Sequence, residues 1–256
     1  MTVHYETDGP VAVVTIDRQD VANAVDHATA MELVAAFDRF EADEALHVAI
    51  LTGAGKNFCA GGDLKAILDG KGVRVEEEGP GPLGPSRMML SKPVIAAVEG
   101  NAVAGGLELS LWCDLRVAAR NATFGVYCRR WGVPLCDGGT VRLPRLIGQS
   151  RAMDMILTGR GVSGEEAYAM GLANRLCEPG AALATARELA SAIAALPQRC
   201  LRSDRRSAYE QWTLPLDAAL LNETRLGREV IAAGELFGAV QGWRSGQKSA
   251  ADFPNV

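Results

Sequence analysis

Hydrophobic residues follow two alternating patterns over about the first 125 positions of the chain. Short runs rich in β-branched residues predict strands at 11–17, 47–52 and 93–98, whereas the apolar spacing of 28–40 is typical of an amphipathic helix. Strands that alternate with helices favour a parallel sheet with crossover helices. We therefore expect an α/β fold for this part of the chain.

Beyond residue 140 the pattern becomes largely helical. Glycine and proline residues interrupt it at intervals, and one short strand is expected near 173–177. The predicted helices are 149–159, 163–171, 180–196, 199–211 and 216–233.

One segment carries neither pattern. Residues 70–85 hold five glycines and three prolines in sixteen positions, a density that the interior of a helix or strand does not tolerate. A long loop is predicted here. Two interpretations stay open for it: a tolerated surface insertion, or a lid over a functional site.

The composition is that of a folded protein with a small negative charge. Of the 256 residues, 48% are hydrophobic, which suits one large domain, or one domain with a short appendage, and excludes a disordered chain. The net charge of −5 leaves no basic surplus for phosphate backbones, so no nucleic-acid partner is expected. Residues 129–256 carry 16 basic and 13 acidic groups, a net +3 that permits a local anion site.

Signals for export, membranes and metals are missing. The N-terminus does not have the order of a signal peptide, and no apolar run has transmembrane length, so we expect a cytoplasmic protein without a membrane partner. The six cysteines form no C-x-x-C pair and are expected to be free thiols. All three histidines lie within the first fifth of the chain, so no metal site is expected.

Two junctions between a strand and a helix share one plan. Both 58–63 and 100–106 follow a predicted strand, contain Ala-Gly-Gly and are followed by a helical pattern. Small residues let a ligand approach the backbone, and the first amides of a helix have no helical acceptor. If the fold brings the junctions together, one amide from each would hold a single negatively charged oxygen, forming an oxyanion hole. The alternative is that the glycines only permit tight turns.

Read together, 58–64 and 105–109 resemble the enoyl-CoA hydratase/isomerase (crotonase) superfamily, and the resemblance extends over essentially the whole chain. Further matching segments are 16–18, 23–24, 92–98, 113–116, 124–125, 138–140, 142–143, 157–159, 167 and 171–172.

This resemblance implies a fold and an assembly. The fold would be a crotonase-like spiral of ββα repeats over 1–195, followed by a helical region, 196–256, that packs in a trimer. A homotrimer, or a hexamer built from two trimers, would be the oligomer. The substrate would be a coenzyme A thioester, and because coenzyme A then belongs to the substrate, no cofactor is expected.

The resemblance also implies where the substrate binds. The thioester oxygen would be held by the amides of Ala60 and Gly105, the segment around Asp63 would lie along coenzyme A, and 70–85 would lie near the acyl chain. The residues assigned to substrate binding are Gly61, Gly62, Asp63, Leu64, Cys128 and Trp131.

Hydratases of this family use two glutamates, and only the first has a match. It is Glu108, while Cys128 stands at the place of the second. An uncharged thiol cannot orient water as a carboxylate does. Asp137, three residues before the family's threonine, is therefore assigned as the second catalytic group, by similarity to family members with a working aspartate there.

Each assignment has a structural alternative. Glu108 would otherwise be salt-bridged, and Asp137 would otherwise cap the helix that follows it. Cys128 would be a packing residue, or a reactive thiol if Arg129 and Arg130 lower its pKa. Trp131 would line the acyl pocket or belong to the core. For Arg199, Arg202 and Arg206 the alternatives are contact with coenzyme A phosphates and a solvated helix face.

The sequence therefore predicts an enoyl-CoA hydratase-like enzyme whose reaction passes through an enolate, with Glu108 and Asp137 as the acid–base pair. Isomerisation, decarboxylation or another enolate reaction that uses Asp137 is the nearest alternative. A protein that binds acyl-CoA without turnover is another. RNA binding, known for some family members, is disfavoured by the net charge.

Overall fold

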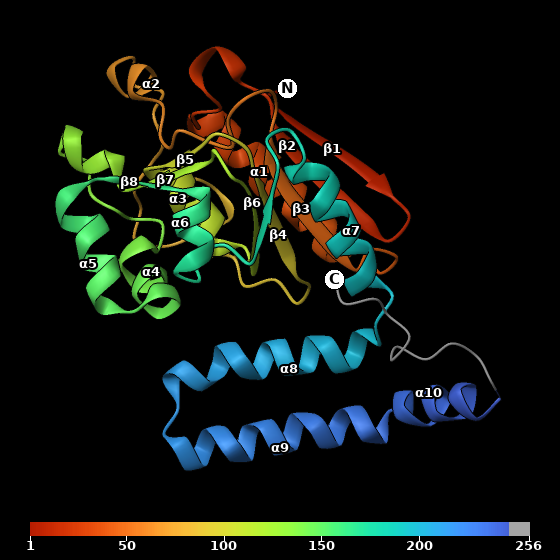
Figure 1. Cartoon of the computed structure of the whole chain (residues 1–256). Helices are drawn as coiled ribbons and strands as arrows, with labels where there is room; N and C mark the ends of the chain where they lie inside the picture. The colour runs from red at the N-terminus through yellow and green to blue at the C-terminus, as the bar shows by residue number, and fades with distance from the viewer. Residues whose placement is uncertain (246–256) are drawn as a thin grey trace. The chain divides into compact units, whose positions relative to one another are not determined.

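The computed structural model describes residues 1–245, and the chain divides into two compact units (Figure 1). The first unit is Met1–Ala190, and the second begins at Ser191. The division falls inside helix α7 (Ala182–Ala194), close to the end of the predicted spiral core.

A six-stranded sheet forms the centre of the first unit. Its strand order is β1-β2-β3-β4-β6-β9, in which β1 and β2 form an antiparallel hairpin and all other pairs are parallel. β3 and β4 are buried almost throughout, which explains their continuous apolar sequences. The strands are β1 (Val3–Asp8), β2 (Val11–Ile16), β3 (Val48–Gly53), β4 (Val94–Val98), β6 (Leu115–Ala119) and β9 (Arg175–Cys177).

A second sheet of three short strands accompanies the first. β5 (Asn101–Val103) pairs with β7 (Thr123–Gly125) in parallel, and β7 pairs with β8 (Gly161–Ser163) in antiparallel. The chain thus passes from β4 to β5 and then into helix α3 (Gly105–Trp112), and from β6 to β7. These three strands are too short to show a hydrophobic period, and the sequence pattern did not predict them. It also missed β1 and β6 of the central sheet.

Helices surround the sheets of the first unit. Asp26 caps α1 by accepting a hydrogen bond from the amide of Thr29 (2.8 Å), and the helix buries Leu33 and Phe37. Helix α4, which contains Pro144, begins at Gly139 and is the helix expected after Asp137. The remaining bounds are α1 (His27–Ala42), α2 (Leu64–Leu68), α4 (Gly139–Ile147), α5 (Gln149–Thr158) and α6 (Gly164–Ala169). Short 3-10 helices are η1 (Gln19–Val21), η2 (Pro85–Arg87), η3 (Tyr127–Trp131) and η4 (Gln211–Thr213).

The second unit is helical. α8 (Gln198–Glu210) and α9 (Leu216–Ala232) run antiparallel and contact each other, and α10 (Glu235–Arg244) follows α9 (Figure 1). Large apolar side chains on α9 and α10 are exposed, among them Leu221 and Phe237. Within 1–245, no helix is both long and apolar enough to cross a bilayer.

The glycine- and proline-rich loop divides into two parts. Residues 74–80 are exposed, whereas 81–86 are buried in the first unit. Helix η2 begins at Pro85, at the end of the predicted loop. The inner part therefore belongs to the packed structure, and only the outer part has the character of a surface insertion.

Two leucines in the first unit offer a test of which helical positions stabilise it. Leu33 of α1 is fully buried, whereas Leu68 at the end of α2 is 88% exposed. Leu33→Ala is expected to lower the free energy of unfolding by about 2–5 kcal/mol, since it removes buried methyl groups and leaves a cavity. Leu68→Ala should change it by less than about 0.5 kcal/mol. Equilibrium denaturation in urea measures both, and equal losses would contradict the burial described here.

Candidate active site

The two glycine-containing junctions lie side by side. Cys59 pairs with Ala102 of β5: its amide donates to the carbonyl oxygen of Asn101 (2.9 Å), and its own carbonyl oxygen accepts from the amide of Val103 (3.1 Å). A Cβ atom added to Gly61 would lie 2.7 Å from the nitrogen of Gly105. The convergence of the two junctions that the proposed hole requires is therefore present in the fold.

The amide of Ala60 is not available to a ligand. It donates to the carbonyl oxygen of Ala22 (3.1 Å), and the next amide, of Gly61, faces the sulfur of Cys59 (3.3 Å). The assignment of Ala60 to the oxyanion hole is thus corrected, because a donor already bonded to the protein backbone cannot also hold a developing oxyanion.

Gly62 and Gly105 provide the amides that remain. Neither donates to an acceptor within residues 1–245, whereas the following amide of the first junction, of Asp63, bonds the carbonyl oxygen of Val25 (2.9 Å). Gly105 is the first residue of α3, so its amide has no helical acceptor. Gly62 and Gly105 therefore carry the junction amides that remain available to a ligand. Sequence reasoning placed Gly62 only along the substrate, since spacing alone does not show which amides are bonded.

The backbone immediately before Gly105 is in an unusual conformation. Ala104 has φ +53° and ψ −126°, a region that side-chain-bearing residues rarely adopt. A Cβ atom at Gly106 would collide with the carbonyl oxygen of Cys59. The junction is therefore held in a specific shape by its neighbours, which is the condition for a preorganised amide.

Glu108 lies on α3, one turn after Gly105, and is buried. Its Oε1 accepts hydrogen bonds from the amides of Asp137 (2.9 Å) and Gly139 (2.8 Å), the second being the first residue of α4. Burial raises the pKa of Glu108 to about 7, and the negative charge of Asp137 acts in the same direction. The group can thus give or take a proton near neutral pH. No ion pair to Glu108 occurs in residues 1–245, so the salt-bridged alternative is not supported.

Asp137 is buried beside Glu108. Its Oδ1 accepts hydrogen bonds from the amide of Leu83 (2.9 Å) and from the hydroxyl of Ser86, so the carboxyl group connects the inner part of the loop to the site. Burial raises the pKa of Asp137, although these two bonds oppose the shift. The side chain does not cap α4, because no amide of that helix donates to it.

Each of the two carboxyl groups has one oxygen left for a substrate. Oε2 of Glu108 and Oδ2 of Asp137 accept no hydrogen bond within 1–245, and neither is among the fully enclosed polar atoms without a partner. These two oxygens are therefore the ones left for a ligand, although both side chains are almost fully buried, each residue being 2% exposed.

Sequence reasoning missed the residues that hold Asp137. Ser86 and Leu83 come from the loop, and Arg142 donates to the backbone carbonyl oxygens of both Asp137 and Ser86 (2.8 Å each). The Leu83 side chain also lies against Gly105. About fifty positions separate the loop residues from Asp137, so no local sequence signal links them.

Cys128 is a buried thiol near the carboxyl pair. Burial raises its pKa, the charge of Glu108 adds to the shift, and Arg129 opposes it only in part. Arg130 instead stacks its guanidinium group on Tyr127, 3.8 Å from the ring centre. The structure therefore supports a neutral thiol and not an activated thiolate. All six cysteines are free.

Other residues assigned to the substrate have different surroundings. Asp63 is buried and its carboxylate is engaged: Oδ1 caps α2, and Oδ2 pairs with Arg18 (2.9 Å). Its assignment to substrate contact is corrected, since no oxygen remains free. Leu64 is 41% exposed. Trp131 is 70% exposed, which excludes the core alternative and leaves open a position at the pocket entrance.

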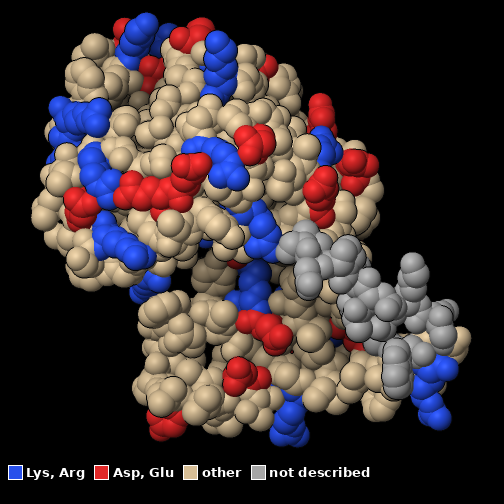
Figure 2. Space-filling model, in the orientation of Figure 1, with Lys and Arg blue, Asp and Glu red and all other residues tan. Residues whose placement is uncertain are grey.

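The arginines of α8 lie in the second unit. Arg206 pairs with Glu210 one turn further along the helix (2.6 Å), as on a solvated helix face. On the face of the molecule shown in Figure 2, basic and acidic side chains are interspersed, without a large area of one sign. This distribution is unlike the continuous basic surface of a nucleic-acid binder.

Comparisons with known proteins identify the class. The model of the enoyl-CoA hydratase/isomerase family matches residues 6–242, and the chain belongs to this family. Its fold is the crotonase fold: the crystal structure of enoyl-CoA hydratase EchA1 from Mycobacterium marinum superimposes with a TM-score of 0.91 at 37% identity, covering 97% of this chain and 98% of that one.

The names of curated relatives refer to several hydratase and dehydratase activities on CoA thioesters. Enoyl-CoA hydratase EchA19 of Mycobacterium tuberculosis is 37% identical over 98% of this chain and 95% of its own length. Mevalonyl-coenzyme A hydratase sidH of Aspergillus fumigatus is 40% identical over 72% and 68%. Carnitinyl-CoA dehydratase of Proteus mirabilis is 39% identical over 75% and 74%.

Replacement of Glu108 tests its raised pKa. Between pH 4.5, the ordinary value, and about 7, the folded protein keeps a proton on Glu108 that the unfolded chain loses. In this window Glu108 therefore binds more protons in the folded protein than in the unfolded chain. Its contribution to stability falls as the pH rises from 4.5 to about 7 and changes little above that pH. Glu108→Gln cannot ionise. Its free energy of unfolding, relative to that of the parent protein, should therefore increase by about 3 kcal/mol between pH 4.5 and about 7.

Denaturant unfolding at several pH values between 4.5 and 8 measures this difference. The matched control is Glu188→Gln at an exposed position, whose stability should run parallel to that of the parent protein. A stability difference for Glu108→Gln that does not change with pH would rule out the raised pKa.

Proposed function

We propose that this protein is an enoyl-CoA hydratase-like enzyme that adds water to the double bond of an acyl-CoA thioester, or removes it in the reverse direction. The observation that carries the proposal is the meeting, in one buried site, of two unbonded backbone amides and two carboxyl groups with raised pKa values. The hydratase and dehydratase names of the relatives support it.

The chemistry follows from these groups. When water attacks the β carbon of an α,β-unsaturated thioester, electrons move to the thioester oxygen and an enolate forms. The amides of Gly62 and Gly105 hold that oxygen and stabilise its charge. One carboxylate takes the proton of the attacking water, and the other carboxyl group gives a proton to the α carbon, so Glu108 and Asp137 must together carry one proton.

Asp137 takes the place of the second glutamate in this proposal. It lies beside Glu108, its Oδ2 accepts no hydrogen bond within 1–245, and burial raises its pKa. Cys128, by contrast, is a neutral thiol that packs near Glu108. The acyl group would extend past Leu83, whose side chain lies against Gly105.

Assembly and location remain proposals. A homotrimer, or a hexamer of two trimers, would cover apolar side chains of the second unit that are exposed in the single chain, such as Leu221 and Phe237. Coenzyme A enters and leaves as part of the substrate, so no separate cofactor is needed. A cytoplasmic location stays a prediction.

Removal of either carboxyl group tests the mechanism. With crotonyl-CoA as the first probe and longer enoyl-CoA thioesters as the next, Glu108→Gln and Asp137→Asn are each expected to lower kcat by about 10²- to 10⁴-fold, because each removes one proton-transfer group. The loss of absorbance of the conjugated double bond measures the rate.

The matched controls are Glu188→Gln and Asp38→Asn at exposed positions of the first unit, which should keep the parent rate. A folded parent protein that binds enoyl-CoA but hydrates none would refute the proposed function and favour a protein that only binds acyl-CoA. Asp137→Asn at the parent rate would refute the role of Asp137 alone.

The pH dependence of hydration gives an independent test. The pair is active with one proton, so activity should fall at low pH, where both groups are protonated, and at high pH, where both are ionised. Because the pKa of Glu108 is raised to about 7, the descending limb of kcat/KM should begin near that pH. Initial rates between pH 4 and 9 measure the profile, and a rate that rises through pH 7 to a plateau would contradict a shared proton.

A further inference from the structure

The amide of Gly62 lies in a turn of two glycines, whose conformation no side chain within the turn restricts. Gly61 and Gly62 have no side chains, and Gly61 adopts φ +94°, a conformation that glycine enters and leaves easily. An oxyanion hole loses effect when its donors move by fractions of an ångström. The position of this amide is therefore set by the contacts of the turn: Val25 pairs with Gly62, its amide donating to the carbonyl oxygen of Gly61 (2.8 Å), and the residues on either side of the two glycines are held as well.

Cys59 anchors the turn on one side, through its pairing with Ala102. On the other side stands Asp63, directly after Gly62. Its amide bonds the carbonyl oxygen of Val25, its Oδ1 accepts from the amides of Lys65 (3.0 Å) and Ala66 (3.1 Å), and its side chain is 7% exposed. Of the side chain, Oδ2 is the atom left to connect this helix cap to another part of the chain.

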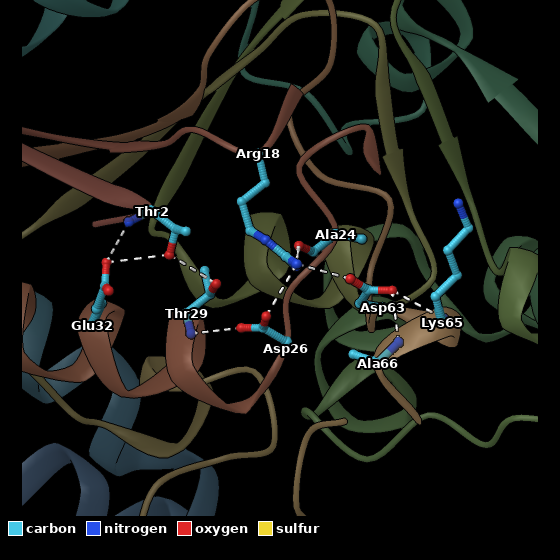
Figure 3. A network of polar contacts seen from close by, with 9 residues as sticks. All are labelled: Thr2, Arg18, Ala24, Asp26, Thr29, Glu32, Asp63, Lys65 and Ala66. Atoms are coloured by element: carbon cyan, nitrogen blue, oxygen red, sulfur yellow. Dashed lines mark hydrogen bonds and ion pairs between the residues drawn. The ribbon is translucent and has the colours of Figure 1, made fainter. Parts of the chain in front are cut away.

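That connection is made by Arg18, which follows strand β2. One of its terminal nitrogens lies 2.9 Å from Oδ2 of Asp63 and 3.1 Å from Oδ2 of Asp26, the residue that caps α1. The other donates to the carbonyl oxygen of Ala24 (2.5 Å). Figure 3 shows the guanidinium group reaching between the two capping carboxylates, at the starts of α1 and α2.

Arg18 is itself held in place. Its backbone amide donates to Oδ1 of Asn23 (2.9 Å), whose side-chain nitrogen bonds the carbonyl oxygen of Asn57 (2.6 Å), just before the first junction. The side chain of Arg18 is 16% exposed, so its ion pairs are shielded from solvent and from salt far more than surface pairs are. A planar guanidinium group suits three acceptors in fixed directions, which an ammonium group does not.

We propose that Arg18 is a positioning residue of the oxyanion hole: by fixing the carboxylate of Asp63, it sets the place of the Gly62 amide that the reacting oxygen binds. The proposal rests on the proposed function for its catalytic consequence. The position of the Gly62 amide can, however, be tested in an experiment that does not depend on catalysis.

A purely structural ion pair would behave differently. It would contribute to folding, and its loss would lower stability without weakening the hydrogen bond to a bound thioester. Arg160 is the matched case, because it also bridges two carboxylates, those of Asp154 and Glu166 (2.6 Å each), but contacts neither junction. The side chain of Arg160 is 39% exposed, so Arg160→Met should change the melting temperature only slightly and leave kcat and KM as in the parent protein.

The experiment compares the parent protein, Arg18→Met, Arg18→Lys and Arg160→Met. With crotonyl-CoA, Arg18→Met is expected to lower kcat by about 10- to 100-fold with little change in KM, because a misplaced donor weakens the transition state more than substrate binding. Arg18→Lys keeps the positive charge but lacks the planar guanidinium group, so its kcat should lie between those of the parent protein and Arg18→Met. If Arg18→Met does not fold, Asp63→Asn, which keeps Oδ1 as the cap, replaces it.

The second readout is the infrared carbonyl stretch of bound butyryl-CoA labelled with ¹³C at the thioester carbon. This saturated ligand cannot be hydrated, so the measurement does not depend on the reaction. The parent protein should shift the stretch to lower wavenumber, Arg18→Met should lose part of the shift, and Arg160→Met should keep it. A folded Arg18→Met protein with the parent kcat and the parent carbonyl shift would overturn the proposal.

The two readouts separate the failures. A parent protein that shifts the carbonyl stretch but hydrates no enoyl-CoA would refute the proposed reaction while the role of Arg18 is still decided by the shift in its variants. A parent protein that binds butyryl-CoA without any shift would refute the hole, and with it the role of Arg18. Equal losses of kcat in Arg18→Met and Arg160→Met would show that Arg18 only stabilises the fold and does not position the Gly62 amide.

Discussion

The close pairing of two backbone segments, around Cys59 and Ala102, is the constraint on which the site depends. It brings a turn from one strand–helix junction against the first residue of α3 and leaves two amides without acceptors there. Such an approach is possible only without side chains: a Cβ atom at Gly61 would come within 2.7 Å of the nitrogen of Gly105, and one at Gly106 would collide with Cys59. Packing thus explains Gly61, Gly105 and Gly106, whereas a Cβ atom at Gly62 would lie 3.7 Å from Val73, an ordinary contact.

The carboxyl groups depend on the same backbone. Glu108 follows Gly105 by one turn of α3, so the helix that presents an amide also presents the acid, and the amides of Asp137 and Gly139 orient its Oε1. Burial raises the pKa of both carboxyl groups, and the hydrogen bonds that they accept from backbone amides lower it in part. Glu108, whose pKa is raised to about 7, therefore keeps a proton at pH values at which an exposed carboxyl group has lost it.

The loop and the segment after β2 each hold one carboxylate of the site. Residues 81–86 are buried, and Ser86 and Leu83 fix the carboxyl group of Asp137. Arg18 fixes Asp63 next to the Gly62 amide (Figure 3). In both cases a short polar side chain close to the reaction centre is held by a partner far away in sequence, which is how irregular backbone is kept in one conformation without extensive apolar packing.

The sequence by itself determined the class of fold, the family, four of the six strands of the central sheet (β2, β3, β4 and β9), most helices of the second half and the importance of both glycine junctions. Hydrophobic periodicity and motif spacing are local properties, so they can be read along the chain. Only the tertiary structure decided that the Ala60 amide is bonded and the Gly62 amide is not, that Asp63 serves a helix cap, and that Asp137 lies beside Glu108. It also decided the three-residue strands of the second sheet. Which donor finds an acceptor, and which carboxyl group loses its water, depends on residues brought together from distant positions, and no local pattern records those contacts.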